Sequence, residues 1–187
     1  MALTPTKLIS LGFKAPDFLL PDVVTGKETT YENIKGKQGT VVMFICNHCP
    51  FVVHIREELV KLANDYQSKG IGFVAISSND VVKYPDDAPE KMKILAEDVN
   101  FPFPYLYDES QEVAKAYEAA CTPDFNVFDW HDRCVYRGQL DDSRPGNEIP
   151  VTGKDLRNVL EGLLQGQNEF PNQIPSVGCN IKWKMNV

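Results

Sequence analysis

The run TVVMFIC at residues 40–46 constrains the fold more than any other segment, because it is almost entirely apolar and rich in β-branched residues. It is too short for a buried helix, and a strand that lacks polar alternation is typically buried on both faces. Such a strand lies in the middle of a sheet. We therefore expect a layered α/β structure built around these residues.

Helical and extended patterns alternate after this run. Pro50 suits the first turn of a helix, where a missing N–H is not needed, and apolar residues then recur at near-helical spacing. A second apolar strand follows at residues 71–78. The next segment predicts a helix with Pro89 in its first turn and with Asp86 and Asp87 as capping residues. This order indicates βαβ units and parallel strands.

The remaining elements complete one domain over residues 1–166. FPYLYD predicts a third strand, residues 110–120 predict a helix capped by Ser110, two more strands follow, and residues 155–165 predict a last amphipathic helix. Near the N-terminus, a turn at Thr25-Gly26 indicates a β-hairpin. The predicted fold is a central mixed β-sheet flanked by helices, with this hairpin as an N-terminal extension.

Residues 167–187 form a C-terminal tail beyond the last predicted helix. After a polar, proline-interrupted start, apolar and polar residues alternate near its end. The apolar members are Ile181, Trp183 and Met185, and the polar members are Lys182, Lys184 and Asn186. The alternation predicts a short strand with one apolar face. We expect this face to pack on the chain's own domain or on a second subunit, in a monomer or a homodimer.

Charge and composition limit the partners. The 187 residues include 19 basic and 26 acidic side chains, a net charge of −7, which repels nucleic acid and anionic membranes. The apolar runs are far shorter than the roughly 18 residues of a membrane span, and the N-terminus lacks the apolar core of a signal peptide. We expect a cytoplasmic protein, whose odd number of cysteines, five, does not indicate a disulfide framework.

The motif Cys46-Asn47-His48-Cys49 lies between the predicted central strand and the helix at Pro50. Two such cysteines can close a small disulfide ring, and a helix start offers free N–H groups and a positive dipole end to the first sulfur. His48 adds a group able to carry positive charge. We predict that Cys46 is an exposed nucleophile with a pKa of about 3.5–7.5, and that Cys49 and His48 complete the catalytic set.

Two other interpretations of the motif stay open. Zinc would need four nitrogen or sulfur ligands, of which this motif supplies two cysteines, with only scattered histidines and cysteines elsewhere to complete a site. The pair can also consist of small buried core residues, although this is less typical of cysteines that flank a polar Asn47-His48. We expect neither a metal nor an organic cofactor.

Several segments resemble a known family. The order of elements, the C-x-x-C motif and the later CTPDFNVFD resemble the thioredoxin superfamily. Over residues 10 to 165, APDFLLPD, VVMFICNHCPF, FPFPYLYDESQEVAKAY and YRGQLDDSRPGN resemble the uncharacterised peroxiredoxin-like branch of the alkyl hydroperoxide reductase/thiol-specific antioxidant (AhpC/TSA) family. The resemblance implies a thioredoxin-like fold.

The resemblance also implies a site. Pro123 would be a cis-proline facing the dithiol, and Thr122 would offer backbone hydrogen bonds to a substrate strand. The implied activity is thiol:disulfide exchange with protein or small-molecule disulfides and thiols. Cys121, two residues before Pro123, and Cys179 in the tail are candidate third thiols.

The sequence departs from the peroxidase pattern of this superfamily, Pro-x3-Thr-x2-Cys. Counting back from Cys49 gives Val42 and Cys46, and counting back from Cys46 gives Gly39 and Met43. The hydroxyl donor that would activate a peroxide is therefore not where the pattern places it. A thiol-dependent peroxidase remains the alternative activity.

Other departures leave further alternatives. The arginine of the peroxidase pattern is not seen around residues 121–124. Thr40 stands near the position of the buried acid that serves proton transfer in thioredoxins, so His48 or His54 is expected to take that role. A redox-inactive module that binds peptides in the groove at Pro123 is the third interpretation.

Overall fold

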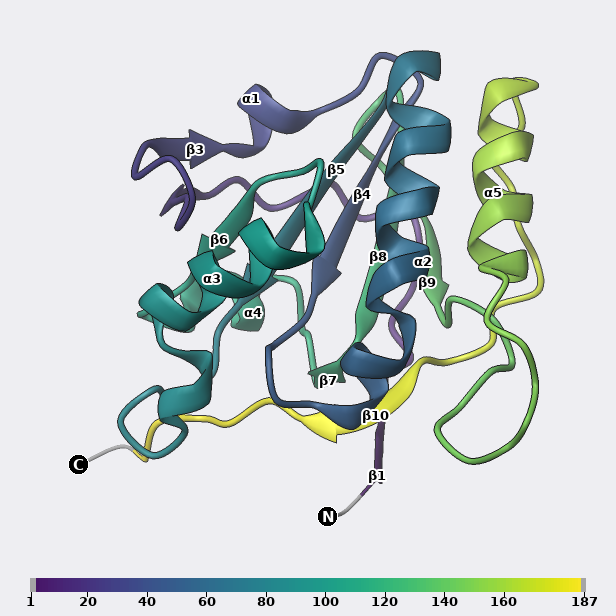
Figure 1. The fold of residues 1–187 in the computed structure, drawn as a ribbon. Helices are drawn as coiled ribbons and strands as arrows, with labels where there is room; N and C mark the ends of the chain where they lie inside the picture. Colours follow the sequence, from purple (N-terminus) through teal and green to yellow (C-terminus); the bar gives the residue numbers. More distant parts are fainter. Residues whose placement is uncertain (1–2, 186–187) are drawn as a thin grey trace.

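A five-stranded mixed sheet forms the centre of the molecule, in the order β6-β5-β4-β8-β9 (Figure 1). The computed structural model describes residues 3–185. The first two residues of the predicted domain and the last two of the predicted tail, Asn186 among them, lie outside the described residues. Strand β4 pairs in parallel with β5 and antiparallel with β8. The strands are β4 (Gly39–Phe44), β5 (Ile71–Ser77), β6 (Tyr105–Tyr107), β8 (Asp124–Asp129) and β9 (Cys134–Gly138).

Strand β4 is buried along its whole length, which confirms the expectation of a central strand. Val41 and Met43 pack into one core, and Val42 and Phe44 pack into the other. The first core lies under α2 (Pro50–Tyr66), α3 (Pro89–Val99) and α5 (Lys154–Leu164). The second lies under the hairpin β2 (Leu19–Pro21) and β3 (Glu28–Thr30), α1 (Tyr31–Ile34) and α4 (Glu112–Ala116).

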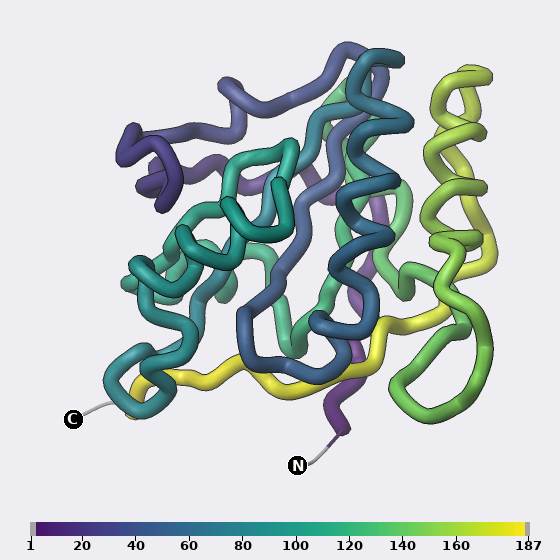
Figure 2. Tube along the Cα trace, viewed as in Figure 1, coloured from purple at the N-terminus to yellow at the C-terminus, as the bar shows by residue number. Residues whose placement is uncertain are grey.

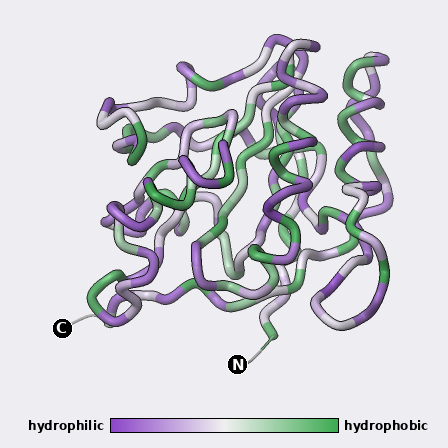
Figure 3. Tube along the Cα trace, in the orientation of Figure 1, coloured by the Kyte–Doolittle hydropathy of each residue, from purple (hydrophilic) through white to green (hydrophobic). Residues whose placement is uncertain are grey.

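The helices are amphipathic rather than apolar, and hydrophobic and hydrophilic positions alternate along α2 and α5 (Figure 3). Among the described residues, no helix combines the length and the apolarity that crossing a membrane requires. Two short 3₁₀ helices, η1 (Gln67–Lys69) and η2 (Pro85–Asp87), follow α2 and precede α3.

Two helix starts differ from the prediction. Ala88 is the N-cap residue of α3 and no side chain caps it, so the prediction that Asp86 and Asp87 cap this helix is wrong. Helix α4 is shorter than the predicted residues 110–120, because left-handed backbone at Gln111 (φ 65°) and Glu118 (φ 50°) brackets it.

The C-terminal segment returns to the N-terminal end of α2 (Figure 2). Strand β10 (Val177–Asn180) lies between β1 (Leu3–Pro5) and β7 (Cys121–Thr122) and is antiparallel to both. The predicted strand near the chain end is thus displaced, and only Ile181 of its apolar face is buried, whereas Trp183 and Met185 are exposed. The backbone of Lys182 binds Asp80 instead of continuing the ladder, with 2.8 Å from Asp80 N to Lys182 O.

Candidate active site

The loop Cys46-Asn47-His48-Cys49 joins the end of β4 to α2. Cys49 is the N-cap residue of α2, and Pro50 occupies its first turn. The first N–H groups of a helix point toward its start, and here the N–H of Val52, which donates to the Cys49 carbonyl at 2.9 Å, also helps to lower the pKa of the Cys49 thiol. The helix start therefore stabilises negative charge on Cys49 rather than on Cys46.

Both thiols are buried, Cys46 at 1% exposure and Cys49 at 0%, so the prediction of an exposed Cys46 is wrong. Thr122 covers them from one side. Its Oγ1 lies 3.4 Å from Cys46 Sγ, and its carbonyl oxygen lies 3.2 Å from Cys49 Sγ. The Thr122-Pro123 peptide bond is cis, as the resemblance implies.

The ionisation of the two thiols is linked, because a hydrogen bond between Cys46 and Cys49 favours the charged form of Cys49 and disfavours that of Cys46. This bond, with support from Cys179 and the N–H of Val52, lowers the pKa of Cys49 to about 4. The same bond, burial and the charge of Asp87 raise the pKa of Cys46 well above its ordinary value. The prediction that Cys46 carries the lowered pKa is therefore wrong for this reduced state.

Thr122 can form hydrogen bonds with the dithiol whichever of the two cysteines is ionised. When Cys46 is the thiol, its hydrogen bond and that of Cys179, whose sulfur lies 2.9 Å away, favour the thiolate of Cys49. When Cys49 is the thiol, it can donate to the Thr122 carbonyl at 3.2 Å and the Thr122 hydroxyl can donate to the Cys46 thiolate at 3.4 Å. Either thiolate therefore has a hydrogen-bond donor beside it.

Asp87 is the site residue that sequence reasoning missed. Its side chain is buried, and one oxygen accepts from the backbone N–H of Asn47 at 2.8 Å and of His48 at 3.3 Å. The other oxygen lies 2.7 Å from His48 Nδ1 and accepts from Asn79 Nδ2 at 2.8 Å. Asp87 therefore fixes the dithiol loop. A usable signal was that the loops after parallel strands β4 and β5 meet at one edge of the sheet.

His48 lies close to Cys46, but the partner of its ring nitrogen is the Asp87 carboxylate rather than a cysteine sulfur. Nδ1 binds Asp87, and the ring stacks on Tyr84 with 5.7 Å between centroids. The second predicted proton carrier, His54, lies elsewhere, since its Nε2 is 2.7 Å from Ser143 Oγ. Only His48 thus belongs to the dithiol loop.

Cys46, His48 and Asp87 also form the one metal-compatible cluster among the described residues, with ligand atoms within 4.8 Å of one another. A metal would have to displace hydrogen bonds, because both oxygens of Asp87 already accept two each. The hydrogen bonds of Asp87 to Asn47 and His48 indicate that this cluster supports the dithiol loop.

The other cysteines are divided by their contacts. Cys179 Sγ lies 2.9 Å from Cys49 Sγ. Cys121 Sγ instead contacts Thr6 Oγ1 at 3.8 Å and the Pro123 carbonyl at 3.6 Å, and burial raises its pKa. Cys134 is a buried core residue, and none of the five cysteines forms a disulfide.

Arg137 is buried and lies beside Asp124, near the segment where the peroxidase pattern has its arginine. Arg137 on β9 donates to the carbonyls of Tyr117 at 2.6 Å and Glu118 at 2.7 Å, and its guanidinium lies 3.5 Å from the Asp124 carboxylate. These contacts hold the turn before β7 and offset the buried charge of Asp124. They do not involve the dithiol.

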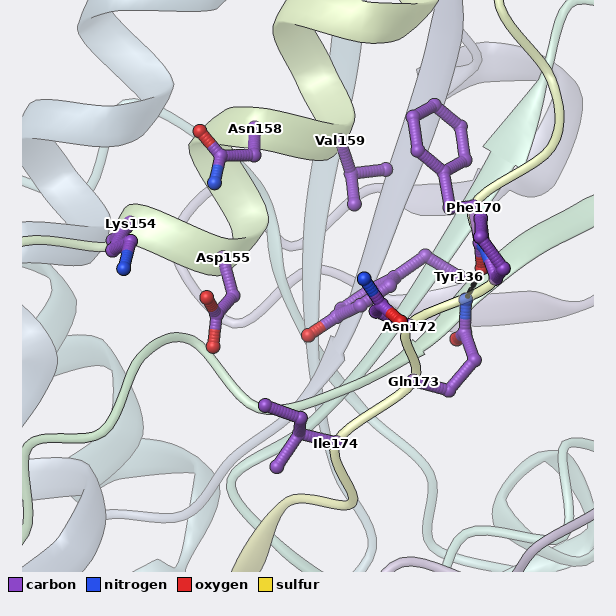
Figure 4. A pocket seen from close by; sticks show the side chains of 10 residues that line it. Tyr136, Lys154, Asp155, Asn158, Val159, Phe170, Asn172, Gln173 and Ile174 are labelled. Atoms are coloured by element: carbon purple, nitrogen blue, oxygen red, sulfur yellow. Dashed lines mark hydrogen bonds between the residues drawn. The ribbon is translucent and has the colours of Figure 1, made fainter.

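The clefts of the molecule do not enlarge the site. A hollow of about 610 Å³ lies between β9, the start of α5 and residues 170–174, lined by Tyr136, Asp155 and Gln173 among others (Figure 4). Its lining includes no member of the dithiol loop. Beside Pro123, a cleft between Phe51 and Val177 offers only about 20 Å³, room for about one water molecule.

Two solved structures are similar to this chain over almost its whole length. An uncharacterized conserved protein from Geobacillus kaustophilus is 57% identical with a TM-score of 0.98, over 100% of this chain and 99% of that one. A hypothetical protein from Sinorhizobium meliloti 1021 is 48% identical with a TM-score of 0.95, over 98% of this chain and 100% of that one. The sequence matches none of the curated proteins.

More distant structures show the fold. The thioredoxin domain of a thiol-disulfide oxidoreductase from Bacteroides vulgatus is 20% identical with a TM-score of 0.65, over 84% of this chain and 99% of that one. The fold is therefore thioredoxin-like, as the resemblance implies. The profile of the AhpC/TSA family matches residues 11–138. This match spans most of the chain and includes the dithiol loop, and the chain belongs to the AhpC/TSA family.

Proposed function

We propose that this protein is a thiol:disulfide oxidoreductase that uses the dithiol of Cys46 and Cys49. The observation that carries the proposal is the position of both sulfurs against Thr122, the residue before the cis-Pro123, with its hydroxyl 3.4 Å from Cys46 Sγ and its carbonyl oxygen 3.2 Å from Cys49 Sγ. A dithiol exchanging electrons with a disulfide needs one thiolate to attack and a second to resolve. Family membership supports a thiol-based redox function.

In the proposed reaction, a proton moves from Cys46 to Cys49 and the Cys46 thiolate attacks one sulfur of a substrate disulfide. A Cys46–substrate bond forms, the substrate S–S bond breaks, and the leaving thiolate takes up a proton. Cys49 then loses its proton and attacks Cys46 Sγ. The Cys46–Cys49 disulfide forms, the second substrate thiolate leaves, and two electrons have passed to the substrate.

The neighbours of the two sulfurs support Cys46 as the residue that attacks first. Cys49 is enclosed by Thr122 and Cys179, whereas Cys46 adjoins Asn47 and His48, which are partly exposed. A substrate sulfur reaches Cys46 after a local opening of this cover. His48, whose side chain is 22% exposed, is the proposed donor of a proton to the leaving sulfur.

Protein and small-molecule disulfides are the proposed substrates, in the reducing compartment that the composition predicts. A peroxidase would need a donor on the peroxide, but Arg137 contacts carbonyls and Asp124 instead. A peptide-binding module would need the backbone edge of Thr122, which pairs with β10. Disulfide exchange is therefore the activity that the geometry supports best.

The proposal is tested by offering the reduced protein either a small disulfide, such as oxidised glutathione, or hydrogen peroxide. We expect the disulfide to convert one Cys46–Cys49 pair per molecule, and peroxide to react no faster than with a free thiol. Cys134→Ser is the matched control and should behave like the unmodified protein. Rapid formation of a sulfenic acid on Cys49 would identify a peroxidase, and inertness to both oxidants would identify a binding module.

A further inference from the structure

Strand β10 brings a third thiol to the dithiol. In the β10–β7 ladder, Cys179 stands directly opposite Thr122, the residue that contacts both Cys46 and Cys49. Cys179 Sγ lies 2.9 Å from Cys49 Sγ, and a covalent S–S bond is about 2.05 Å. The two sulfurs therefore need to approach by less than about 1 Å to form a bond.

The approach of β10 depends on Gly178. This residue lies against the Thr122 carbonyl, and a Cβ atom at position 178 would overlap the carbonyl oxygen. Glycine thus lets the strand come close enough to place the next residue, Cys179, beside Cys49. The close approach of the two strands at this point therefore depends on glycine at position 178.

Anchors hold the strand on both sides of Cys179. Before it, Ser176 donates through Oγ to the Pro123 carbonyl at 2.8 Å and accepts at its own carbonyl from Thr6 N at 2.8 Å. After it, the N–H of Lys182 donates to Asn79 Oδ1 at 2.8 Å, and the same Asn79 donates to Asp87. One amide therefore ties the tail to the carboxylate that fixes the dithiol loop.

We propose that Cys179 is a third redox thiol, which exchanges with Cys49 and so moves the disulfide from Cys46–Cys49 to Cys49–Cys179. This inference rests on the proposed function for the origin of the first disulfide. Cys179 loses its proton and attacks Cys49 Sγ, the Cys46–Cys49 bond breaks, the Cys49–Cys179 bond forms, and Cys46 leaves as a thiolate. One disulfide breaks as another forms, so the exchange is redox-neutral and needs no further oxidant.

The order of these events follows from charge. In the reduced protein, burial and the hydrogen bond to Cys49 raise the pKa of Cys179 to about 12, so Cys179 stays a thiol. Once Cys49 is part of a disulfide, its negative charge no longer opposes ionisation of Cys179. Exchange would then leave an oxidised protein in which Cys46 is again a nucleophile while its resolving partner is occupied.

The pairing is tested in Cys46→Ser, where Cys49 and Cys179 remain but the proposed catalytic pair is gone. After mild oxidation with diamide and alkylation, non-reducing peptide mapping should show most of Cys49 linked to Cys179. Cys46→Ser/Gly178→Ala keeps both thiols but displaces the strand, and the linkage should fall several-fold. Cys46→Ser/Cys134→Ser is the matched control and should keep it. A Cys179 that stays alkylated in Cys46→Ser would overturn the proposal, whatever the activity of the unmodified protein.

The exchange itself is tested in the unmodified protein oxidised with one equivalent of a small disulfide. We expect a measurable fraction of molecules with Cys46 alkylated and Cys49 linked to Cys179. In Cys179→Ser, which should fold because a buried hydroxyl replaces a thiol, all oxidised molecules should carry Cys46–Cys49 instead. If the alkylated fraction of Cys46 were the same in the unmodified protein and in Cys179→Ser, the proposed transfer of the disulfide to Cys179 would be contradicted. Absence of any disulfide at Cys46 in both would contradict the proposed function instead, and the pairing result in Cys46→Ser separates the two failures.

Discussion

Cys49→Ser is expected to trap a disulfide substrate on Cys46, whereas Cys46→Ser should accumulate no adduct and lose turnover. In Cys49→Ser, the thiolate at position 46 still attacks, but the residue that resolves the mixed disulfide is gone. In Cys46→Ser, the sulfur of Cys179 lies 2.9 Å from the remaining sulfur of Cys49 and can displace any adduct. Intact mass after incubation with a small disulfide measures both outcomes.

The double variant Cys46→Ser/Cys49→Ser is the control for adducts on other cysteines. A stable adduct in Cys46→Ser, together with none in Cys49→Ser, would make Cys49 the attacking residue. The roles in the proposed mechanism would then be exchanged.

Asp87→Asn is expected to destabilise the protein and to change the acidity of Cys46. The buried carboxylate accepts bonds from Asn47, His48 and Asn79, and an amide can satisfy only part of this set. Hydrogen bonds to a charged group contribute about 1.5–3 kcal/mol, which corresponds to a fall in Tm of roughly 3–12 °C for a domain of this size. Thermal unfolding followed by circular dichroism measures the change.

The effect on acidity separates a positioning role from a purely structural one. The charge of Asp87 contributes to the raised pKa of Cys46, so the neutral amide should lower that pKa. The Cys49→Ser background isolates Cys46, and its alkylation rate should there begin to rise at a lower pH when position 87 is Asn. Asp86→Asn, which removes an exposed carboxylate paired with Lys91, is the matched control and should change neither property much. An unmoved pH profile would show that Asp87 only stabilises the loop.

Local patterns predicted the elements that carry the dithiol. The run at residues 40–46 and the proline at position 50 indicate a buried strand and a helix start, and both are found at β4 and α2. The alternating pattern predicted the layers as well. These features depend on neighbouring residues, so they can be read without knowing the tertiary structure.

The distribution of charge within the site could not be predicted in the same way. Asp87 reaches the loop from 40 positions away in sequence and Cys179 reaches it from 130. These contacts help to put the lowered pKa on Cys49 instead of Cys46, and no spacing rule connects them to the motif. Asp87 was misassigned as a helix cap for the same reason. A carboxylate just before a helix commonly caps it, but here Asp87 instead binds the dithiol loop, which is distant in sequence.

The central claim is that Cys46 and Cys49 form a reversible two-electron couple, and its reduction potential tests this directly. The unmodified protein and Cys179→Ser would be equilibrated in buffers of defined thiol–disulfide ratio, and the thiols at positions 46 and 49 quantified by alkylation. In Cys179→Ser, where no third thiol can take over the disulfide, we predict that Cys46 and Cys49 are oxidised together in a two-electron transition, with a midpoint between about −120 and −270 mV, the range of thioredoxin-fold oxidoreductases. If Cys46 and Cys49 stay alkylatable throughout that range in both proteins, the dithiol is not a redox centre and the account fails.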